Sequence, residues 1–284
     1  MPRAGRGSCS FLCSFSRSRS RSSSVESARA WRTTRRATSA CSACTTRSLR
    51  SFAGPPLSTW SRNNRLPALA TLALTLTAAA IALIFFYAPL DEDGLNQKIF
   101  YFHVPIAFTA YGCFAWGGWK ALRHLWKGEE GADLESYVAI HLGVIFGVLT
   151  LVTGSIWARY RWGHWWVWSE DQLVLFLVLF LFYCAYFMLR FSVPPGPQRA
   201  NLSAVYALFG VVLIPVSVLA IRLSERFIHP VAFDKGGPNM AGSQFFTFCV
   251  SCAAMFSLAA TLYNLELVGK RLDMRLRELR EALQ

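Results

Sequence analysis

The chain has 284 residues, of which 54% are hydrophobic and only 16% are charged. An average soluble domain carries about 25% charged residues, so this composition argues against a soluble domain and is typical of a membrane protein. The net charge is +13, but residues 1–65 hold 13 of the 29 Lys and Arg residues and a single acidic residue, Glu26. Because the rest of the chain is nearly neutral, the charge does not predict nucleic-acid binding.

Residues 1–63 form a leader rich in Ser, Arg, Ala and Thr, with stretches such as "SRSRSRSSS" and "RTTRRATSACSACTTR". The leader has no sustained apolar period, so we expect it to be disordered. Two interpretations stay open. Arg-rich, Ser-rich and acid-poor leaders resemble organellar transit peptides. Alternatively, the native start lies downstream and the leader is translated from the wrong frame of GC-rich DNA.

Six apolar runs follow, each near the roughly 20 residues that a helix needs to cross the hydrocarbon core of a bilayer. The predicted spans are residues 66–90, 101–122, 137–157, 173–189, 202–221 and 242–263. The sequence therefore predicts an all-α integral membrane protein with six transmembrane helices. Residues 64–265 form its membrane domain, and residues 266–284 form a charged C-terminal helix at the inner face.

Basic residues in the connecting segments predict the orientation, because cytoplasmic loops are enriched in Lys and Arg. With both termini inside, the inner loops and the C-terminal segment carry ten Lys and Arg residues, whereas the outer segments carry six. Arg62 and Arg65, just before the first span, add to the bias. We therefore expect both termini on the inner side.

Four tryptophans lie within seven residues of the outer segment between the third and fourth spans, in "RWGHWWVWSEDQ". Trp162, Trp165 and Trp166 have the spacing of one helical face, and Trp168 follows them. Indole rings offer flat apolar faces that suit stacking against a porphyrin, and a short interfacial helix could present them. Tryptophan is also enriched at membrane interfaces because its ring is amphipathic, so interfacial anchoring remains the alternative.

Three of the five histidines fall at the predicted outer face: His103 in "YFHVP", His229 in "RFIHP", and His164 among the tryptophans. Neutral imidazole is a common metal ligand and an axial ligand of haem iron, so His103 and His229 could flank the aromatic surface. Arg159 and Arg161 could pair with the two haem carboxylates through charge-assisted hydrogen bonds, or could snorkel to lipid headgroups instead.

His141 lies within the third predicted span, and an ionisable residue there is a functional hypothesis by default. A neutral histidine can also hydrogen-bond a neighbouring helix, and this is the interpretation that we favour for His141.

Three motifs together resemble a known family. "WGHWWVW" resembles the tryptophan-rich signature of the cytochrome c assembly family of haem-handling membrane proteins. "KIFYFHVPIAF" and "RFIHP" resemble the stretches that carry the first and second outer histidines in its haem exporter protein C branch, which also has six spans with short loops. The resemblance covers roughly residues 66–265.

The resemblance implies a haem-binding protein that presents haem b, bound transiently, at the outer face for cytochrome c maturation. Its expected partners are a membrane-anchored haem chaperone, a pair of ATP-binding-cassette subunits and a small one-span protein, all in a lipid bilayer. The expected location is a bacterial inner membrane with the site on the periplasmic face, or alternatively an organellar inner membrane. The implied site residues are the iron ligands His103 and His229 and the haem platform Trp162, Trp165, Trp166 and Trp168.

The sequence departs from the family signature, which usually continues with Trp-Asp and then a basic residue. Here Ser169, Glu170, Asp171 and Gln172 follow the aromatic run, so the acid is displaced and the basic partner is missing. The segment before the second histidine, often rich in tryptophan, is "SERF". These changes bear on how the chain grips haem and docks its chaperone.

Two other functions remain open. A membrane oxidoreductase with permanent b-type haem usually holds it between histidines of facing spans, and only His141 is clearly intramembrane. A transporter subunit with interfacial tryptophan anchors is the other, although the spans contain almost no charge that would mark an ion path. The chain shows neither an ATP-binding G-x-x-x-x-G-K-[ST] stretch nor an obvious nucleophile, so we do not expect an enzyme.

Overall fold

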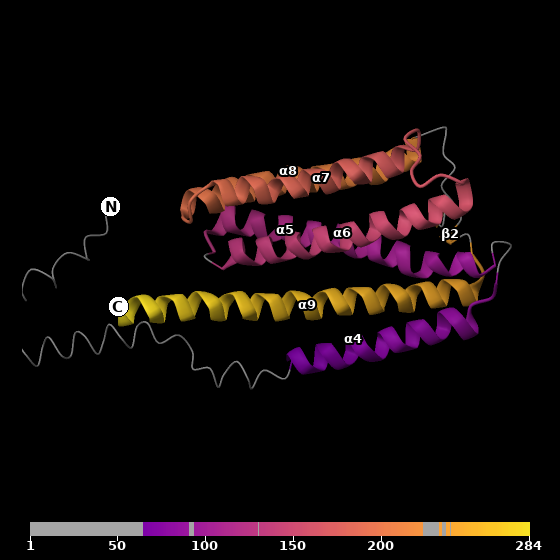
Figure 1. Ribbon diagram of the computed structural model, residues 1–284, viewed down its shortest axis with the longest axis horizontal. Helices are drawn as coiled ribbons and strands as arrows, with labels where there is room; N and C mark the ends of the chain where they lie inside the picture. Colours follow the sequence, from indigo (N-terminus) through magenta and orange to yellow (C-terminus); the bar gives the residue numbers. More distant parts are fainter. Residues whose placement is uncertain (1–64, 91–93, 130, 224–232, 235–236, 239) are drawn as a thin grey trace, which may run out of the picture. The chain divides into compact units, whose positions relative to one another are not determined.

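The structure is a computed structural model that describes residues 65–90, 94–129, 131–223, 233–234, 237–238 and 240–284 (Figure 1). The leader and His229 lie outside these residues. The helices are α4 (Arg65–Ala82), α5 (Phe100–Lys127), α6 (Ala132–Trp162), α7 (Asp171–Ser192), α8 (Pro197–Leu223) and α9 (Gly242–Leu283). A π-helical turn, η2 (Leu83–Tyr87), follows α4, and a 3-10 turn, η3 (Leu95–Ile99), precedes α5. Strands β1 (Phe233–Asp234) and β2 (Gly237–Pro238) pair as a short antiparallel ladder.

Six helices of the described chain are long and apolar enough to cross a membrane, which confirms the prediction of an all-α protein with six spans. Helices α5 to α9 extend beyond the predicted runs, because polar residues outside the hydrocarbon core can continue a helix, whereas the first span ends at Tyr87 rather than at residue 90. Helix α6 ends only at Gly163, whose positive φ of 75° lets its N–H bond the Arg159 carbonyl, and Gly128 ends α5 in the same way. Helix α9 continues unbroken through residues 266–283. The division into a membrane domain and a C-terminal helix stays a prediction, as does the side on which the termini lie.

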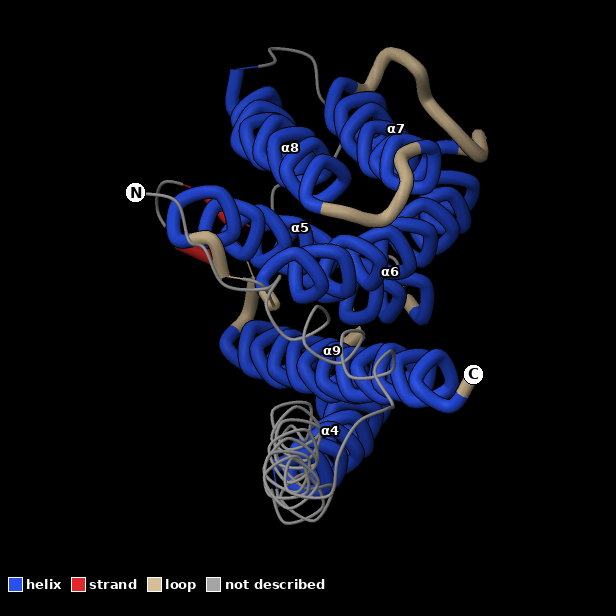
Figure 2. Tube along the Cα trace, turned by 90° about the vertical axis from the view of Figure 1, so that its left-hand side faces the viewer, coloured by secondary structure: helices blue, strands red, loops and turns tan. Residues whose placement is uncertain are grey.

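The six helices form three layers of two (Figures 1 and 2). The hairpin of α5 and α6 lies in the middle and has the most extensive helix–helix contact. The α7–α8 hairpin covers one side of it, and α4 packs with α9 on the other. Short connections force α5 against α6 and α7 against α8 as antiparallel neighbours.

Glycines allow the central layers to approach closely, as small residues do in other membrane bundles. Phe114 of α5 and Tyr183 of α7 are both fully buried and stack with ring centroids 4.0 Å apart. A Cβ atom at Gly143 would lie 2.6 Å from the Phe114 ring, and one at Gly210 would lie 2.5 Å from the Tyr183 ring. These glycines therefore make the space that the stacked pair fills.

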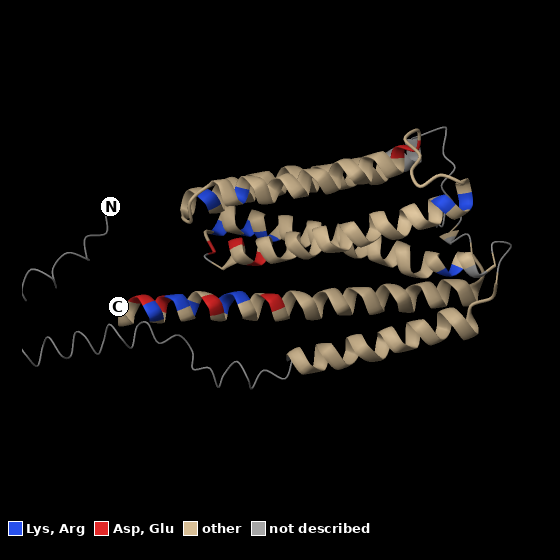
Figure 3. Cartoon of the chain, viewed as in Figure 1, with Lys and Arg blue, Asp and Glu red and all other residues tan. Residues whose placement is uncertain are grey.

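Charged side chains gather toward the two ends of the bundle (Figure 3). We call one the charged end: it comprises the α5–α6 and α7–α8 connections and the second half of α9. There Arg190 donates two hydrogen bonds of 2.7 Å to Asp133, and Lys120 and Arg271 both pair with Glu135. The opposite end, which we call the tryptophan end, holds the α6–α7 connection and the start of α5.

His141 bonds a neighbouring helix, as expected. Its Nδ1 atom lies 2.9 Å from a carboxylate oxygen of Glu266 on α9, and its ring lies parallel to that of Tyr137, one turn away. Lys270 also pairs with Glu266, at 3.4 Å. His141 thus belongs to the polar network that joins α6 to the charged end of α9.

Candidate functional site

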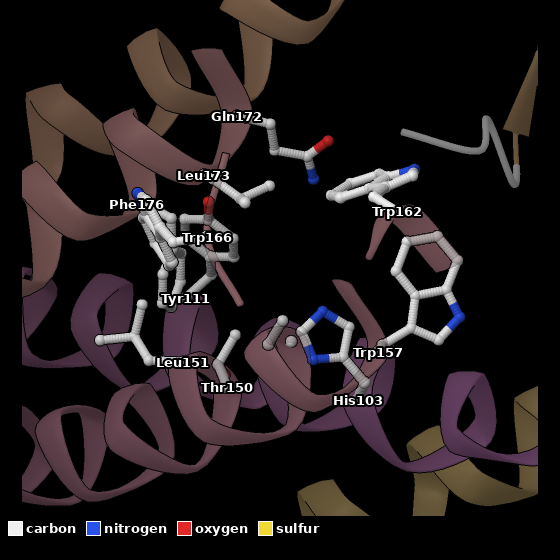
Figure 4. Close-up of a pocket in the computed structure, with 12 residues that line it drawn as sticks. His103, Tyr111, Thr150, Leu151, Trp157, Trp162, Trp166, Gln172, Leu173 and Phe176 are labelled. Atoms are coloured by element: carbon white, nitrogen blue, oxygen red, sulfur yellow. The ribbon is translucent and has the colours of Figure 1, made fainter. Parts of the chain in front are cut away.

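A pocket of about 560 Å³, counting the space at its mouth, lies at the tryptophan end between α5, α6 and α7 (Figure 4). Ligand pockets are mostly apolar with a few polar groups. This pocket follows that pattern, and its polar and aromatic lining includes His103, Tyr111, Trp157, Trp162, Trp166 and Gln172. It therefore brings together one predicted histidine and two predicted tryptophans from separate parts of the chain.

His103 lies in the first turn of α5, and buried contacts fix where that turn begins. Lys98 is 5% exposed, and its Nζ atom donates a 2.7 Å hydrogen bond to the Ala88 carbonyl, which ties η3 back to the end of η2. The imidazole then reaches α6, where Nδ1 lies 2.9 Å from the hydroxyl oxygen of Thr153. The ring also packs on Gly154, where a Cβ atom would come within 2.9 Å of its Cε1 atom.

The tryptophans divide between the pocket and the surface. Trp162 and Trp166 line the pocket, whereas Trp165 is 61% exposed and Trp168 is 74% exposed. The short helix expected to present Trp162, Trp165 and Trp166 on one face is wrong: α6 ends at Trp162, and Gly163 turns the chain into a non-helical connection. The glycine was the sequence signal against that helix, because it stops helices in the left-handed conformation.

Indole edges contact one another around the pocket. Trp157, which lies outside the predicted tryptophan-rich motif, meets Trp162 edge to face with ring centroids 5.1 Å apart. Trp166 meets Trp168 in the same manner at 6.0 Å. The Nε1 atom of Trp166 is buried and has no hydrogen-bond partner within the described part of the chain. A buried N–H without an acceptor is costly.

Arg159 and Arg161 lie at the exposed end of α6. The Arg159 guanidinium donates to the Gly163 carbonyl and lies 6.0 Å from the centre of the Trp165 ring. It therefore helps to close the helix and to hold Trp165. Pairing of the two arginines with haem carboxylates stays a prediction. His164 is exposed in the same connection, and the second predicted ligand, His229, lies outside the described residues.

The residues after Trp168 have separate positions. Glu170 is only 2% exposed and precedes α7, where its backbone carbonyl accepts from the N–H groups of Leu173 and Val174. Asp171 is exposed. Gln172, the last of the four residues that depart from the family signature, lines the pocket. One residue of the departure from the signature therefore lies in the pocket wall.

Tyr111 and Gln172 were also missed as pocket residues. Tyr111 reaches from α5 to α8, where its hydroxyl lies 3.1 Å from that of Ser217. No local pattern marks either residue, because both reach the pocket only when α5, α6 and α7 assemble around it. Sequence motifs could find the histidine and the tryptophans but not the residues that complete the wall.

The six apolar helices define a multi-pass membrane protein, and a pocket lies near one end of its bundle. The family described as Heme exporter protein C matches residues 48–282 of this chain, and the chain belongs to that family.

Individual relatives agree with this assignment. Heme exporter protein C of Paracoccus denitrificans is 30% identical over 201 residues, which cover 70% of this chain and 82% of the relative. A putative cytochrome c biosynthesis ccmC-like mitochondrial protein of Marchantia polymorpha is 28% identical over 192 residues, covering 67% and 81%. Heme exporter protein C of Escherichia coli K12 is 32% identical over 133 residues, covering 46% and 54%.

Proposed function

We propose that this protein binds haem in the pocket at the tryptophan end and passes it to a membrane-anchored haem chaperone during cytochrome c maturation. Membership of the heme exporter protein C family supports the haem-handling role. The structural observation that carries the proposal is that His103, Trp162 and Trp166 line one pocket.

The chemistry of the pocket suits haem as a cargo. Haem is a flat apolar disc with iron at its centre and two carboxylates at its edge. The imidazole of His103 supplies an iron ligand, and the indole faces of Trp157, Trp162 and Trp166 supply apolar area for the ring. We assign the second iron ligand to His229 by its motif, and Arg159 and Arg161 to the carboxylates.

Transfer requires a site that holds haem without trapping it. In our proposal the histidines hold the iron, the pocket tryptophans hold the ring, and the exposed rings of Trp165 and Trp168 meet the chaperone. The protein then acts as a carrier rather than an enzyme, and haem b remains unmodified while bound. A pair of ATP-binding-cassette subunits and a small one-span protein complete the proposed assembly.

We place the pocket on the periplasmic face of a bacterial inner membrane, with an organellar inner membrane as the alternative. The excess of basic residues in the opposite connections supports this orientation, because such residues favour the cytoplasmic side.

The position of His141 argues against the alternative of a b-type haem oxidoreductase. That protein class usually holds haem between histidines deep in facing spans. Here His141 bonds Glu266, which belongs to the charged end of the bundle, whereas His103 lines the pocket at the tryptophan end. The imidazoles of His141 and His103 therefore have separate contacts, and they do not face each other across one pocket. A transporter subunit with anchoring tryptophans remains an outcome of the following test.

The visible spectrum of the protein purified from membranes, with its haem chaperone co-expressed, tests the proposal. We expect a Soret band that falls in both His103→Ala and His229→Ala. His164→Ala is the matched control, because His164 lies exposed in the same connection as the tryptophans. A wild-type protein without a Soret band, or a band indifferent to both changes, would contradict the proposal and favour interfacial anchoring.

A further inference from the structure

We propose that Thr153 is a positioning residue that selects the iron-binding tautomer of His103 and fixes the direction of its ring. This inference rests on the proposed function, because it concerns the nitrogen that would bind haem iron. Thr153 lies on α6 and His103 on α5. The hydrogen bonds around the Thr153 hydroxyl group decide which nitrogen of His103 carries the proton.

The hydroxyl of Thr153 has a single hydrogen, and its own helix offers the acceptor for it. The oxygen lies 2.8 Å from the Leu149 carbonyl and 3.3 Å from the Thr150 carbonyl. This is the usual bond of a helical threonine to the carbonyl four residues earlier. With its hydrogen directed there, the Thr153 oxygen keeps lone pairs that can accept from another donor.

The donor is then the Nδ1–H group of His103, 2.9 Å from the Thr153 oxygen. A neutral imidazole carries one N–H, so this assignment leaves the lone pair on Nε2. An imidazole binds iron through an unprotonated nitrogen, so this is the tautomer that can bind through Nε2. The reverse assignment would take the Thr153 hydrogen away from the Leu149 carbonyl and put a proton on Nε2. Thr153 thus favours the binding-competent form before haem arrives.

Gly154 completes the seat for the ring. A Cβ atom at this position would lie 2.9 Å from Cε1 of His103 and 3.6 Å from each ring nitrogen. The missing side chain therefore lets the edge of the imidazole rest directly on α6. Two consecutive residues, Thr153 and Gly154, hold the ring by a hydrogen bond and by close packing.

A hydrogen-bond acceptor behind a metal-binding histidine orients it and raises its basicity, and its removal commonly costs about 10- to 100-fold in affinity. We therefore expect Thr153→Val, which keeps the shape but removes the acceptor, to bind haemin about 10-fold or more weakly. The same change should move the reduction potential of bound haem to a more positive value, because a less basic ligand stabilises ferric iron less. Thr153→Ser restores the hydroxyl and should recover both properties.

The experiment is a haemin titration of the purified full-length variants, followed by a spectroelectrochemical titration of the bound haem. Thr109→Val is the matched control: Thr109 is buried in α5, bonds only its own helix at the Pro105 carbonyl in the described contacts, and does not line the pocket. Thr153→Ala is a second variant without the hydroxyl, for use if the valine variant does not fold.

The outcomes separate the inference from the proposed function. If His103→Ala loses haemin affinity while Thr153→Val and Thr153→Ala match wild type in affinity and potential, Thr153 has no positioning role, although the haem site stands. If His103→Ala itself binds haemin normally, the ligand assignment fails. Weak binding by both variants without a hydroxyl, with recovery in Thr153→Ser and normal binding in Thr109→Val, is the result that we expect.

Discussion

The two ends of the bundle use polar side chains in opposite ways. At the charged end, Arg190 forms a bidentate pair with Asp133, and Glu135 receives both Lys120 and Arg271. At the tryptophan end, the Trp166 N–H has no partner among the described groups, and His103 contacts Thr153 beside a pocket. The difference indicates that one end ties helices together, whereas the other leaves a pocket between its helices.

The largest expected effect is on stability, from breaking the buried pair at the charged end. The Arg190 side chain is only 7% exposed, so Asp133→Ala leaves a buried charge without its partner. Removing one partner of such a pair commonly costs about 3–5 kcal/mol. We expect a loss of that order in the free energy of unfolding, measured by denaturant titration in detergent micelles.

Glu129→Ala is the control for that prediction. Glu129 pairs with Arg123, but both side chains are about one-third exposed, and such surface pairs contribute about 0–1 kcal/mol. Equal losses of unfolding free energy in Asp133→Ala and Glu129→Ala would contradict the structural role that we assign to the charged end.

A smaller effect, now on binding, is expected from Gly154→Ala. The added methyl group would lie 2.9 Å from His103, so the imidazole must move away from α6. We expect haemin affinity to fall about 10-fold in a titration. The free energy of unfolding should change little, because alanine favours a helix over glycine by about 0.5–1 kcal/mol, which offsets the cost of displacing the imidazole. Gly269→Ala, in a helix with nothing within 4 Å of the new methyl, should leave affinity at the wild-type value. A normal affinity in Gly154→Ala would mean that the ring does not rest on this glycine when haem is bound.

Substitutions of the tryptophans should distinguish haem binding from haem transfer to the chaperone. We expect Trp165→Leu and Trp168→Leu to bind haemin normally but to load the chaperone several-fold more slowly, since both rings are exposed. Trp162→Leu should weaken binding itself, because its ring lines the pocket. The rate of haem appearance on the chaperone, followed by absorbance, distinguishes the two classes. Identical behaviour of all three variants would contradict the division between pocket and surface.

The smallest effect is expected at His141. His141→Leu removes a hydrogen bond to Glu266, and interhelical bonds within membrane proteins are worth about 0.6 kcal/mol on average. We expect a loss of that size in unfolding free energy and an unchanged Soret band, because His141 does not line the pocket. A band that disappears in His141→Leu would revive the oxidoreductase alternative.

The sequence predicted the spans more completely than it predicted the site. Apolar runs of about 20 residues are a local signal, and all six correspond to helices. The ends of these helices could not be read from hydropathy, because capping by Gly128 and Gly163 decides where α5 and α6 stop. The same cap separates Trp165 from Trp162, although their spacing alone would place them on one helical face.

Within the site, His103, Trp162 and Trp166 could be predicted because their residue types are chemically distinctive. Thr153 could not, because a threonine in an apolar span is ordinary until α5 places an imidazole against it. Gln172 looked like a departure from a motif and proves to be part of the pocket wall. Contacts between helices, which no local pattern encodes, account for what was missed.

The most direct test of the central claim is chemical rescue of the His103 ligand. In His103→Gly, the imidazole that would bind iron is replaced by a space of its own shape. We predict that this variant loses the Soret band of the haem-loaded protein and that added free imidazole restores it, with no such response in His164→Gly. A full Soret band in His103→Gly without imidazole would show that this residue does not bind the iron, and would contradict the account.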